Sequence, residues 1–210
     1  MIKNIIFDLG NVLVKVDLEK FEKSVLSEGV KEKSYIRFLK SNKGYLTKNF
    51  RNVIFAYETG RINTTKFVDI CLKNLKSGLS KRLFIKHFNE MLVEKPEMKR
   101  FIEELTKKTS YRFMLLSNTN SLHWQYVKKN FPYVMSLGTF ELSYNLKLYK
   151  PDIRVYTTVI KKHKLIPLET LYVDDHEDNC LAARLLGIYS ILYKDFSSFK
   201  KEFREYLKRR

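Results

Sequence analysis

Short apolar runs recur along the chain and alternate with segments of helical periodicity. Four runs rich in β-branched and aliphatic residues are typical of buried strands, and they are residues 2–7, 112–116, 170–173 and 188–192. Apolar residues spaced three or four positions apart predict helices at residues 121–131, 154–165 and 177–187. Because strands and helices alternate, we expect an α/β fold whose core is a parallel, doubly wound sheet.

A long interval between the first two strands breaks this alternation. Between about residues 15 and 95 every periodic segment is amphipathic and helical, and the segments are residues 17–26, 34–40, 49–60, 64–75 and 80–92. Their apolar positions are interpreted as a buried core rather than a binding stripe. The interval therefore predicts an all-helical insertion in the α/β domain.

The C-terminal segment, residues 195–210, has the pattern of one more amphipathic helix. Its large apolar side chains lie three or four positions apart and are Phe196, Phe199, Phe203 and Leu207. A basic face would also suit a membrane surface. We expect the helix to pack on the domain instead, because an aromatic stripe on a terminal helix normally completes a core.

Composition indicates an ordinary folded protein. With 210 residues, of which 44% are hydrophobic and 14% aromatic, the chain can bury a sizeable core. Cys71 and Cys180 lie far apart and outside any CxxC spacing, so neither a disulfide framework nor a zinc site is predicted. The apolar start is interrupted by Asp8, too early for a signal peptide, and no stretch is long enough for a membrane span. We therefore expect a cytoplasmic protein.

The net charge of +17 raises nucleic acid as a partner. The basic residues are scattered, however, and no dense block or aromatic-interleaved motif accompanies them. We interpret them as a lysine-rich solvated surface that also attracts anionic substrates, and we regard a nucleic-acid function as the minor alternative. Nothing in the sequence indicates an oligomeric state.

Polar residues gather where the predicted strands end. The first strand ends in Asp8, the second in Ser117 and Asn118, and the third in Asp174 and Asp175. A loop between the second and third strands, "KLYKPD", carries Lys150. In a parallel sheet the carboxyl ends of the strands share one edge, where ligands bind.

This set of residues has the chemistry of a phosphate and metal site. Carboxylates can bind a hard cation such as Mg²⁺, whereas hydroxyl, amide and ammonium groups can hold a phosphate. Each residue taken singly is compatible with a simple turn or helix cap. Their joint position at one sheet edge is what favours a functional site.

At these positions the chain resembles the haloacid dehalogenase-like hydrolase superfamily over essentially its whole length. "FDLGNVLV", "LLSNTN", "LYKPD" and "YVDDHEDN" are similar to the four motifs of the superfamily. The resemblance implies a Rossmann-like core formed by residues 1–14 and 96–210, with an inserted all-helical cap domain at residues 15–95. Within the superfamily, the motif variants are most similar to small sugar-phosphate phosphatases such as α-D-glucose-1-phosphate phosphatase.

The resemblance implies roles for the catalytic and metal residues. Asp8 would be the nucleophile that forms an aspartyl-phosphate, which water then cleaves. Mg²⁺ would be held by the Asp8 carboxylate, the Gly10 backbone carbonyl and Asp175, with Asp174 as a direct or indirect partner. Lys150 would offset phosphate charge and steady Asp8.

The phosphoryl oxygens would be bound by a second group of atoms. These are the Ser117 hydroxyl and the backbone amide of Asn118, helped by the amides of Leu9 and Gly10 and by the Lys150 ammonium. The implied function is that of a Mg²⁺-dependent phosphatase acting on a small phosphorylated metabolite, and specifically on a sugar phosphate.

Gly10 departs from the pattern of many phosphatases of the superfamily, which carry there a second Asp as general acid and base. One possibility is that His176, Asn11 through a water, or a cap residue near Tyr57 and Glu58 supplies the proton. The other is that the substrate has a good leaving group, as in a sugar phosphorylated at its anomeric carbon.

Two alternative functions stay open. A metal-independent 2-haloacid dehalogenase also lacks the second Asp, although the adjacent carboxylates Asp174 and Asp175 would repel one another beside Asp8 without a cation. A catalytically idle relative that binds a phosphorylated ligand or a partner is the other alternative, and it does not explain why all four motifs are intact.

Overall fold

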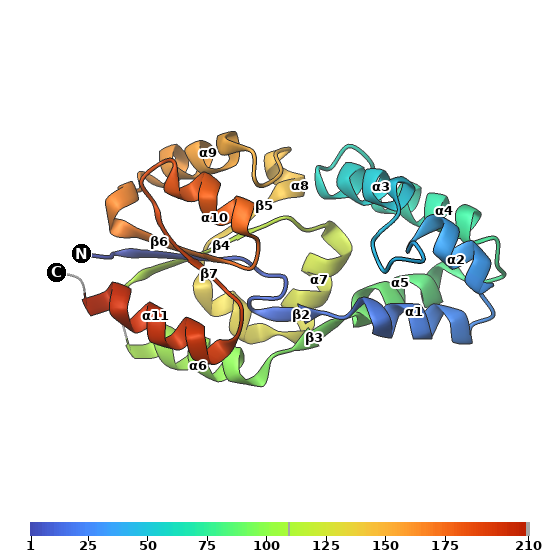
Figure 1. Ribbon diagram of the computed structural model, residues 1–210, viewed down its shortest axis with the longest axis horizontal. Helices are drawn as coiled ribbons and strands as arrows, with labels where there is room; N and C mark the ends of the chain where they lie inside the picture. The colour runs from blue at the N-terminus through green and yellow to red at the C-terminus, as the bar shows by residue number, and fades with distance from the viewer. Residues whose placement is uncertain (109, 209–210) are drawn as a thin grey trace.

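The computed structural model describes residues 1–108 and 110–208, and its central feature is a five-stranded parallel sheet (Figure 1). The predicted strands are present as β1 (Asn4–Phe7), β4 (Arg112–Ser117), β6 (Thr170–Asp174) and β7 (Tyr189–Leu192). The fifth strand, β5 (Phe140–Leu142), was not predicted, because three residues are too short to show a period. The strand order is β5-β4-β1-β6-β7, so β1 is central.

The register of the sheet brings the polar strand ends together. Phe7 pairs with Leu115 on one side and with Val173 on the other. Asp8, one residue further, therefore emerges at the level of Leu116 and Asp174. This alignment is a consequence of parallel pairing on both sides of β1.

Helices cover both faces of the sheet, as expected for a doubly wound α/β fold. In Figure 1, α9 (Ile153–His163) and α10 (Glu177–Arg184) lie above the sheet, whereas α6 (Pro96–Lys108) and α11 (Phe196–Lys208) lie below it. The remaining elements of this part are α7 (Ser121–Asn130), η1 (Pro132–Leu137), α8 (Ser143–Leu146) and η2 (Pro167–Glu169). Two separate apolar clusters fill the space between the sheet and these helices.

Alternation along β1 explains how one short strand supports both clusters. Ile5 and Phe7 belong to the larger cluster, and Ile6 belongs to the smaller one on the opposite face. The ring of Phe203 from α11 stacks on Phe7 at a centroid distance of 6.4 Å. The C-terminal helix thus completes the core, and residues 209–210 of the predicted segment lie outside the described residues.

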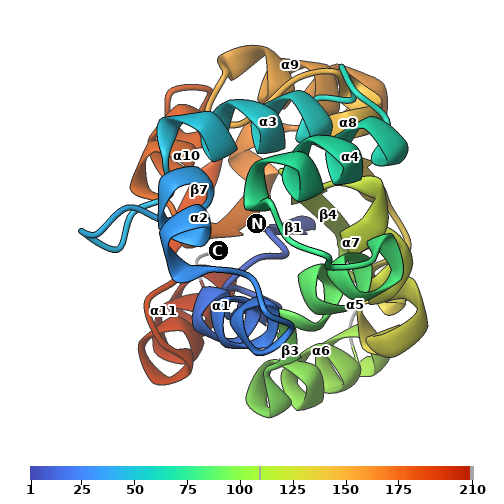
Figure 2. The same cartoon turned by 90° about the vertical axis from the view of Figure 1, so that its right-hand side faces the viewer.

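A helical part follows β1, at the right of Figure 1. Its helices are α1 (Leu18–Ser27), α2 (Glu32–Phe38), α3 (Lys48–Glu58), α4 (Thr64–Leu75) and α5 (Lys81–Glu90). Four of them begin after a capping side chain that accepts a hydrogen bond from a backbone N–H of the first turn, and the caps are Asp17, Thr47, Asn63 and Ser80. Figure 2 shows α3 and α4 on one side of this part and α1 and α5 on the other.

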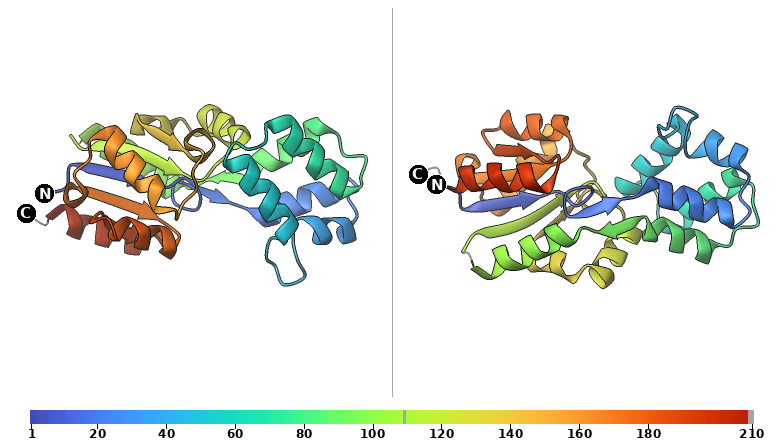
Figure 3. Two further views of the ribbon diagram at one scale, coloured as in Figure 1. Left: turned by 90° about the horizontal axis from the view of Figure 1, so that it is seen from above. Right: turned by 60° about the horizontal axis from the view of Figure 1, so that its bottom comes forward.

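Two short antiparallel strands connect the parts. β2 (Val14–Val16) pairs with β3 (Leu92–Glu94), so the chain enters and leaves the helical part through adjacent strands. Both views of Figure 3 show this connection, with the two chain termini at the far end of the molecule. The division into residues 1–14 with 96–210 and residues 15–95 stays a prediction.

The described residues contain no helix that is both long and apolar enough to cross a membrane.

Candidate active site

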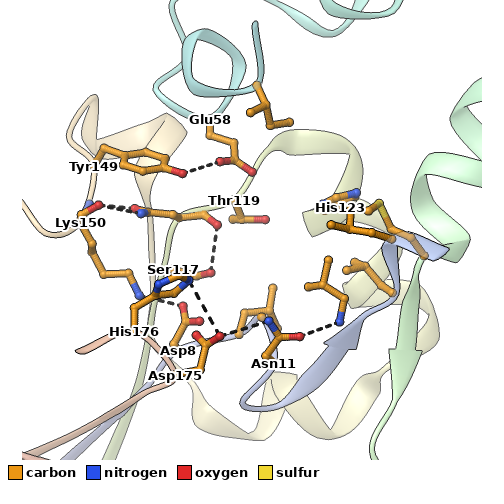
Figure 4. Close-up of a pocket in the computed structure, with 18 of the residues that line it drawn as sticks. Asp8, Asn11, Glu58, Ser117, Thr119, His123, Tyr149, Lys150, Asp175 and His176 are labelled. Carbon is orange, nitrogen blue, oxygen red and sulfur yellow. Dashed lines mark hydrogen bonds and ion pairs between the residues drawn. The ribbon is translucent and has the colours of Figure 1, made fainter. Parts of the chain in front are cut away.

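A cavity of about 310 Å³ lies between the carboxyl edge of the sheet and the helical part. Figure 4 shows the residues on its wall. Seven of the residues predicted from the sequence line it, and they are Asp8, Leu9, Gly10, Ser117, Asn118, Lys150 and Asp175. Asp174, the eighth, is fully buried behind them. The structure therefore gathers the predicted residues around one space.

Asp8 and Lys150 form a buried ion pair at the base of the cavity. Lys150 Nζ lies 2.8 Å from Asp8 Oδ1 and 2.7 Å from Asp174 Oδ2. The same nitrogen lies 2.9 Å from the Leu116 carbonyl oxygen and 2.8 Å from the Tyr172 hydroxyl. The Lys150 ammonium is held by groups on β4 and β6 and by two carboxylates, so it has one defined position beside Asp8.

The electrostatics of this pair follow from burial and charge. Burial opposes the charge on Lys150, but the carboxylates of Asp8 and Asp174 outweigh it and raise the pKa of the ammonium. Burial, with a smaller contribution from the neighbouring carboxylates of Asp174 and Asp175, raises the pKa of Asp8 to about 6 against the lowering effect of Lys150. An additional cation beside Asp8 would favour its ionised form.

Asp174 and Asp175 are adjacent in sequence but differ in surroundings. The Asp174 carboxylate accepts hydrogen bonds from the Asn179 amide at 2.9 Å and the His176 backbone N–H at 2.8 Å, besides those from Lys150 and Tyr172. The side chain of Asp175 is 18% exposed and faces the cavity. Asp174 is therefore engaged by the protein on both oxygens, whereas Asp175 is available to a ligand.

The carboxylates are placed as a divalent-cation site requires. One oxygen each from Asp8, Asp174 and Asp175 lie within 4.8 Å of one another. Lys150 is paired with Asp8 and Asp174, and its single positive charge does not balance the two carboxylates that it contacts. The Gly10 carbonyl accepts one hydrogen bond, from the Val12 N–H at 2.6 Å, and keeps a second lone pair. An all-oxygen donor set of this kind fits Mg²⁺.

Asn11 connects the carboxylate cluster to the strands that lead to the helical part. Its amide nitrogen donates to Asp175 Oδ2 at 3.1 Å, and its side-chain oxygen accepts from the Val16 N–H at 3.1 Å. Its backbone carbonyl accepts from Lys95 Nζ at 2.7 Å. Asn11 adopts a φ of 52°, which asparagine tolerates better than most residues.

Ser117 is the last residue of β4 and Asn118 follows it at the cavity wall. The Ser117 side chain is buried and lines the cavity. The Asn118 side chain brackets the backbone of Lys150: its Nδ2 donates to the Lys150 carbonyl at 3.0 Å, and its Oδ1 accepts from the Lys150 N–H at 2.9 Å. Only the backbone amide of Asn118 was predicted to matter, and the side chain is found to position the lysine loop.

The helical part supplies the opposite wall. Leu46, Phe50 and Ile54 contribute apolar side chains to this wall. Glu58, the last residue of α3, places its carboxylate in the cavity. In Figure 4, Glu58 lies across the cavity from Asp8, and its Oε2 accepts a hydrogen bond of 3.1 Å from the Tyr149 hydroxyl. Burial raises the pKa of Glu58 to about 7, although its hydrogen bonds from Tyr149 and Asn120 act in the opposite direction.

The other candidate proton donors are placed less suitably. The His176 side chain is 74% exposed and lies at the rim. The Tyr57 hydroxyl is engaged by Thr64 at 2.8 Å and Ser121 at 2.9 Å, where the helical part meets α7. Asn11 has an amide that cannot release a proton at neutral pH.

Several supporting residues were missed by sequence reasoning. Tyr172 lies two residues before Asp174 on β6, so strand alternation places both side chains on one face, and this signal was available. Asn179 lies one helical turn after the strand, within the fourth motif. Tyr149 was also missed; its contact with Glu58, which the sequence had offered as a candidate proton donor, arises only through tertiary packing, and no local pattern indicates it.

Comparison with known proteins agrees with this geometry. A family model described as haloacid dehalogenase-like hydrolase matches residues 2–187. The chain belongs to this family. The family resemblance and the α/β fold predicted from the sequence are thereby confirmed.

Individual relatives of the family cover nearly the whole chain. The chain is 28% identical to a D-ribitol-5-phosphate phosphatase from Bacteroides thetaiotaomicron over 96% of its length and 97% of the relative. It is similar to the structure of a HAD family enzyme from the same organism in complex with magnesium and inorganic phosphate, with a TM-score of 0.77, 29% identity, and coverage of 95% and 99% of the two chains. An L-2-haloacid dehalogenase from Xanthobacter autotrophicus shares the fold, with a TM-score of 0.63, 16% identity, and coverage of 98% and 83%.

Proposed function

We propose that the protein is a Mg²⁺-dependent phosphatase that hydrolyses a small phosphorylated metabolite, a sugar or sugar-alcohol phosphate, through an aspartyl-phosphate. The observation that carries this proposal is the buried Asp8, which directly follows the central strand, is held by Lys150, and lies beside Asp175. The family membership supports hydrolytic chemistry, and the relative named as a D-ribitol-5-phosphate phosphatase supports the substrate class.

The first step uses the fixed orientation of Asp8. A carboxylate oxygen of Asp8 attacks phosphorus, and the ester oxygen departs. Bound Mg²⁺, held by Asp8, Asp175 and the Gly10 carbonyl, would neutralise charge on the phosphoryl oxygens. Asp174 holds Lys150 rather than the substrate, so we assign it a positioning role.

The phosphoryl group needs donors around its oxygens. Ser117 supplies a hydroxyl and Asn118 a backbone amide, while Leu9 and Gly10 supply amides of the turn that follows Asp8. Lys150 adds the positive charge. Because these donors lie on one rigid sheet edge, they require little reorganisation during reaction.

We also propose that the helical part is a cap that selects the substrate, because it forms the wall opposite the phosphate site. The apolar side chains of Leu46, Phe50 and Ile54 restrict the cavity to a small organic group. We place the enzyme in the cytoplasm with a metabolite as its partner, and we assign no nucleic acid to its scattered basic surface.

A metal-independent dehalogenase is a weaker alternative. The dehalogenases share 16–20% identity with this chain, which reflects the common fold alone. The partly exposed carboxylate of Asp175 beside buried Asp8 and Asp174 favours a cation-dependent site. A protein that only binds a ligand does not need a carboxylate held in place by a buried lysine, as Asp8 is by Lys150.

The deciding experiment measures phosphate release from D-ribitol 5-phosphate, glucose 1-phosphate and an aryl phosphate, with Mg²⁺ and after chelation. We expect turnover that requires Mg²⁺, and we expect Asp8→Asn to retain less than about 1% of it because a carboxamide cannot form the aspartyl-phosphate. Thermal melting shows that the variant is folded. Halide release from 2-chloropropionate without metal would identify a dehalogenase, and inactivity on every ester would indicate a binding protein.

A further inference from the structure

The departure of an alkoxide from a phosphate ester requires a proton donor, and Gly10 beside the nucleophile has no side chain to provide one. The titratable groups on the described cavity wall can be compared for this task. Asp8 is the nucleophile, Asp175 faces the cation site, and Lys150 is paired with two carboxylates. None of these three is free to shuttle a proton.

His123 is excluded by its hydrogen bonds. Its Nε2 lies 3.0 Å from the Phe88 carbonyl oxygen, and its Nδ1 lies 3.2 Å from the Asn120 amide nitrogen. Burial lowers the pKa of His123 to about 4, so the ring is neutral and both of its nitrogens are engaged. Its face stacks on Phe88 at a centroid distance of 4.2 Å, which indicates a structural role.

Glu58 is held in the cavity by contacts with the α/β part. Ser143 Oγ, on α8, donates to the Glu58 backbone carbonyl at 2.5 Å, and Lys147 Nζ lies 3.3 Å from the Gly60 carbonyl. The Tyr149 hydroxyl, one residue before Lys150, fixes the Glu58 carboxylate itself. The helical part therefore delivers this carboxyl group to a defined place when it packs on the sheet edge.

We propose that Glu58 is the general acid and base of the reaction, delivered from the helical part to the position opposite Asp8. This inference rests on the proposed phosphatase function. Burial and the Asp8 carboxylate raise the pKa of Glu58, and they outweigh the hydrogen bonds from the Tyr149 hydroxyl and the Asn120 amide, which lower it. A carboxyl group with a pKa of about 7 can give a proton and take it back at pH 7.

The proposed steps balance in atoms and protons. As Asp8 bonds to phosphorus, the bond from phosphorus to the ester oxygen breaks, and the departing oxygen takes the proton of Glu58. In the second step, the Glu58 carboxylate takes a proton from water while the water oxygen bonds to phosphorus. The bond from phosphorus to Asp8 then breaks, and phosphate leaves with Asp8 ionised and Glu58 protonated again.

The test separates the two chemical steps in Glu58→Gln, an isosteric change that retains a hydrogen-bond acceptor for Tyr149. Single-turnover release of the leaving group is measured in Mg²⁺ with 4-nitrophenyl phosphate, whose leaving group needs no proton, and with D-ribitol 5-phosphate. Asp69→Asn is the matched control, because it is the same carboxyl-to-amide change at an exposed ion pair with Lys81 on the helical part. Thermal melting verifies the fold of both variants.

We expect the Glu58→Gln variant to release 4-nitrophenolate in a first turnover at close to the wild-type rate and to accumulate phosphoenzyme. Its first turnover of D-ribitol 5-phosphate should fall by roughly 10²- to 10⁴-fold. Asp69→Asn should behave as wild type with both esters. Equal losses on both esters, or no loss on either, would overturn the role of Glu58, whereas a wild type inactive on both would contradict the phosphatase function itself.

A second variant tests whether the missing proton donor is the cause. A Cβ added at Gly10 would meet Val16 Cγ2 at 3.4 Å and Asp8 Oδ2 at 3.9 Å, which are ordinary contacts, so a side chain can begin there without a clash. We expect Gly10→Asp in the Glu58→Gln background to recover at least about tenfold of the lost D-ribitol 5-phosphate rate.

Discussion

At the scale of single residues, Asp174 and Asp175 show how neighbouring carboxylates acquire different tasks. Asp174 lies inside the protein with Lys150, Tyr172 and Asn179 around it. The Asp175 carboxylate faces the cavity, where the Asn11 amide donates to it at 3.1 Å and the His176 ring lies 3.9 Å away at the rim. The difference follows from their positions, because Asp174 is the last residue of β6 whereas Asp175 lies in the bend that follows the strand.

Substitution of Asp175 should therefore weaken the response to Mg²⁺, whereas substitution of Asp174 should lower stability. Asp175→Ala should keep the fold and raise the Mg²⁺ concentration needed for half-maximal activity at least about tenfold, because a cation ligand is lost. Asp174→Ala should lower the free energy of unfolding by roughly 3–5 kcal/mol, because buried Lys150 loses a partner. Mg²⁺ titrations of activity and denaturant melts measure the two effects. Equal Mg²⁺ responses in both variants would contradict the assignment.

Glu58 carries a cost in stability that depends on pH. Its pKa is raised from 4.5 in the unfolded chain to about 7 in the folded protein, chiefly by burial. Below about pH 4 both states are protonated and Glu58→Gln should change nothing. As the pH rises from 4.5 to about 7, the unfolded chain releases the Glu58 proton before the folded protein does. The wild type therefore loses stability that the variant retains.

We therefore expect metal-free Glu58→Gln to be more stable than the wild type by about 1–3 kcal/mol at pH 8, with no difference near pH 4. Denaturant unfolding across this range measures the difference. A variant that is less stable at pH 8 would show that Glu58 is a favourable ionised partner rather than a buried carboxyl group.

At the scale of elements, the turn after α3 packs closely on α8. Gly60 has a φ of 64°, and a Cβ there would overlap the Tyr144 carbonyl oxygen and Lys147 Nζ. The same turn follows Glu58, whose carbonyl Ser143 binds at 2.5 Å. A glycine is therefore needed both for the backbone conformation and for the approach of the two parts.

Gly60→Ala should disturb the packing of the helical part and lower kcat/KM for sugar phosphates by at least about tenfold, because misplacement of a catalytic group by about 1 Å is costly. Gly44→Ala is the control: Gly44 has a φ of 81°, yet nothing lies within 4 Å of an added Cβ. Steady-state kinetics of both variants and hydrogen exchange of the turn after α3 distinguish Gly60→Ala from Gly44→Ala. Identical losses in both variants would indicate backbone strain alone.

At the scale of the whole molecule, we expect the cluster of Asp8, Asp174 and Asp175 to make folding sensitive to divalent cations. Mg²⁺ that binds only the folded protein should raise its stability by about 2.7 kcal/mol at a concentration one hundred times the Kd. Thermal melting with and without Mg²⁺ measures this gain, and Asp175→Ala should reduce it. An unchanged melting temperature in saturating Mg²⁺ would contradict a cation site in the folded protein.

Much of the α/β part could be predicted because its determinants are local. The apolar runs at residues 2–7 and 170–173 have the composition of buried strands, and the polar residues that follow them must share a sheet edge if the strands are parallel. Strands β2, β3 and β5 were not predicted, because strands of three residues have no measurable period. The roles of the gathered side chains stay predictions until the variants are measured.

The sequence by itself determined the α/β alternation, the helical insertion and the set of polar residues at the strand ends, since periodicity and chain order suffice for these. Only the tertiary structure decided that Asp174 is enclosed while Asp175 faces the cavity, and that Glu58 meets Tyr149 across 91 positions of sequence. That contact depends on how the helical part packs on the sheet edge, through Gly60 and Ser143. Packing of this kind is a sum of many distant contacts, and no local pattern of residues encodes it.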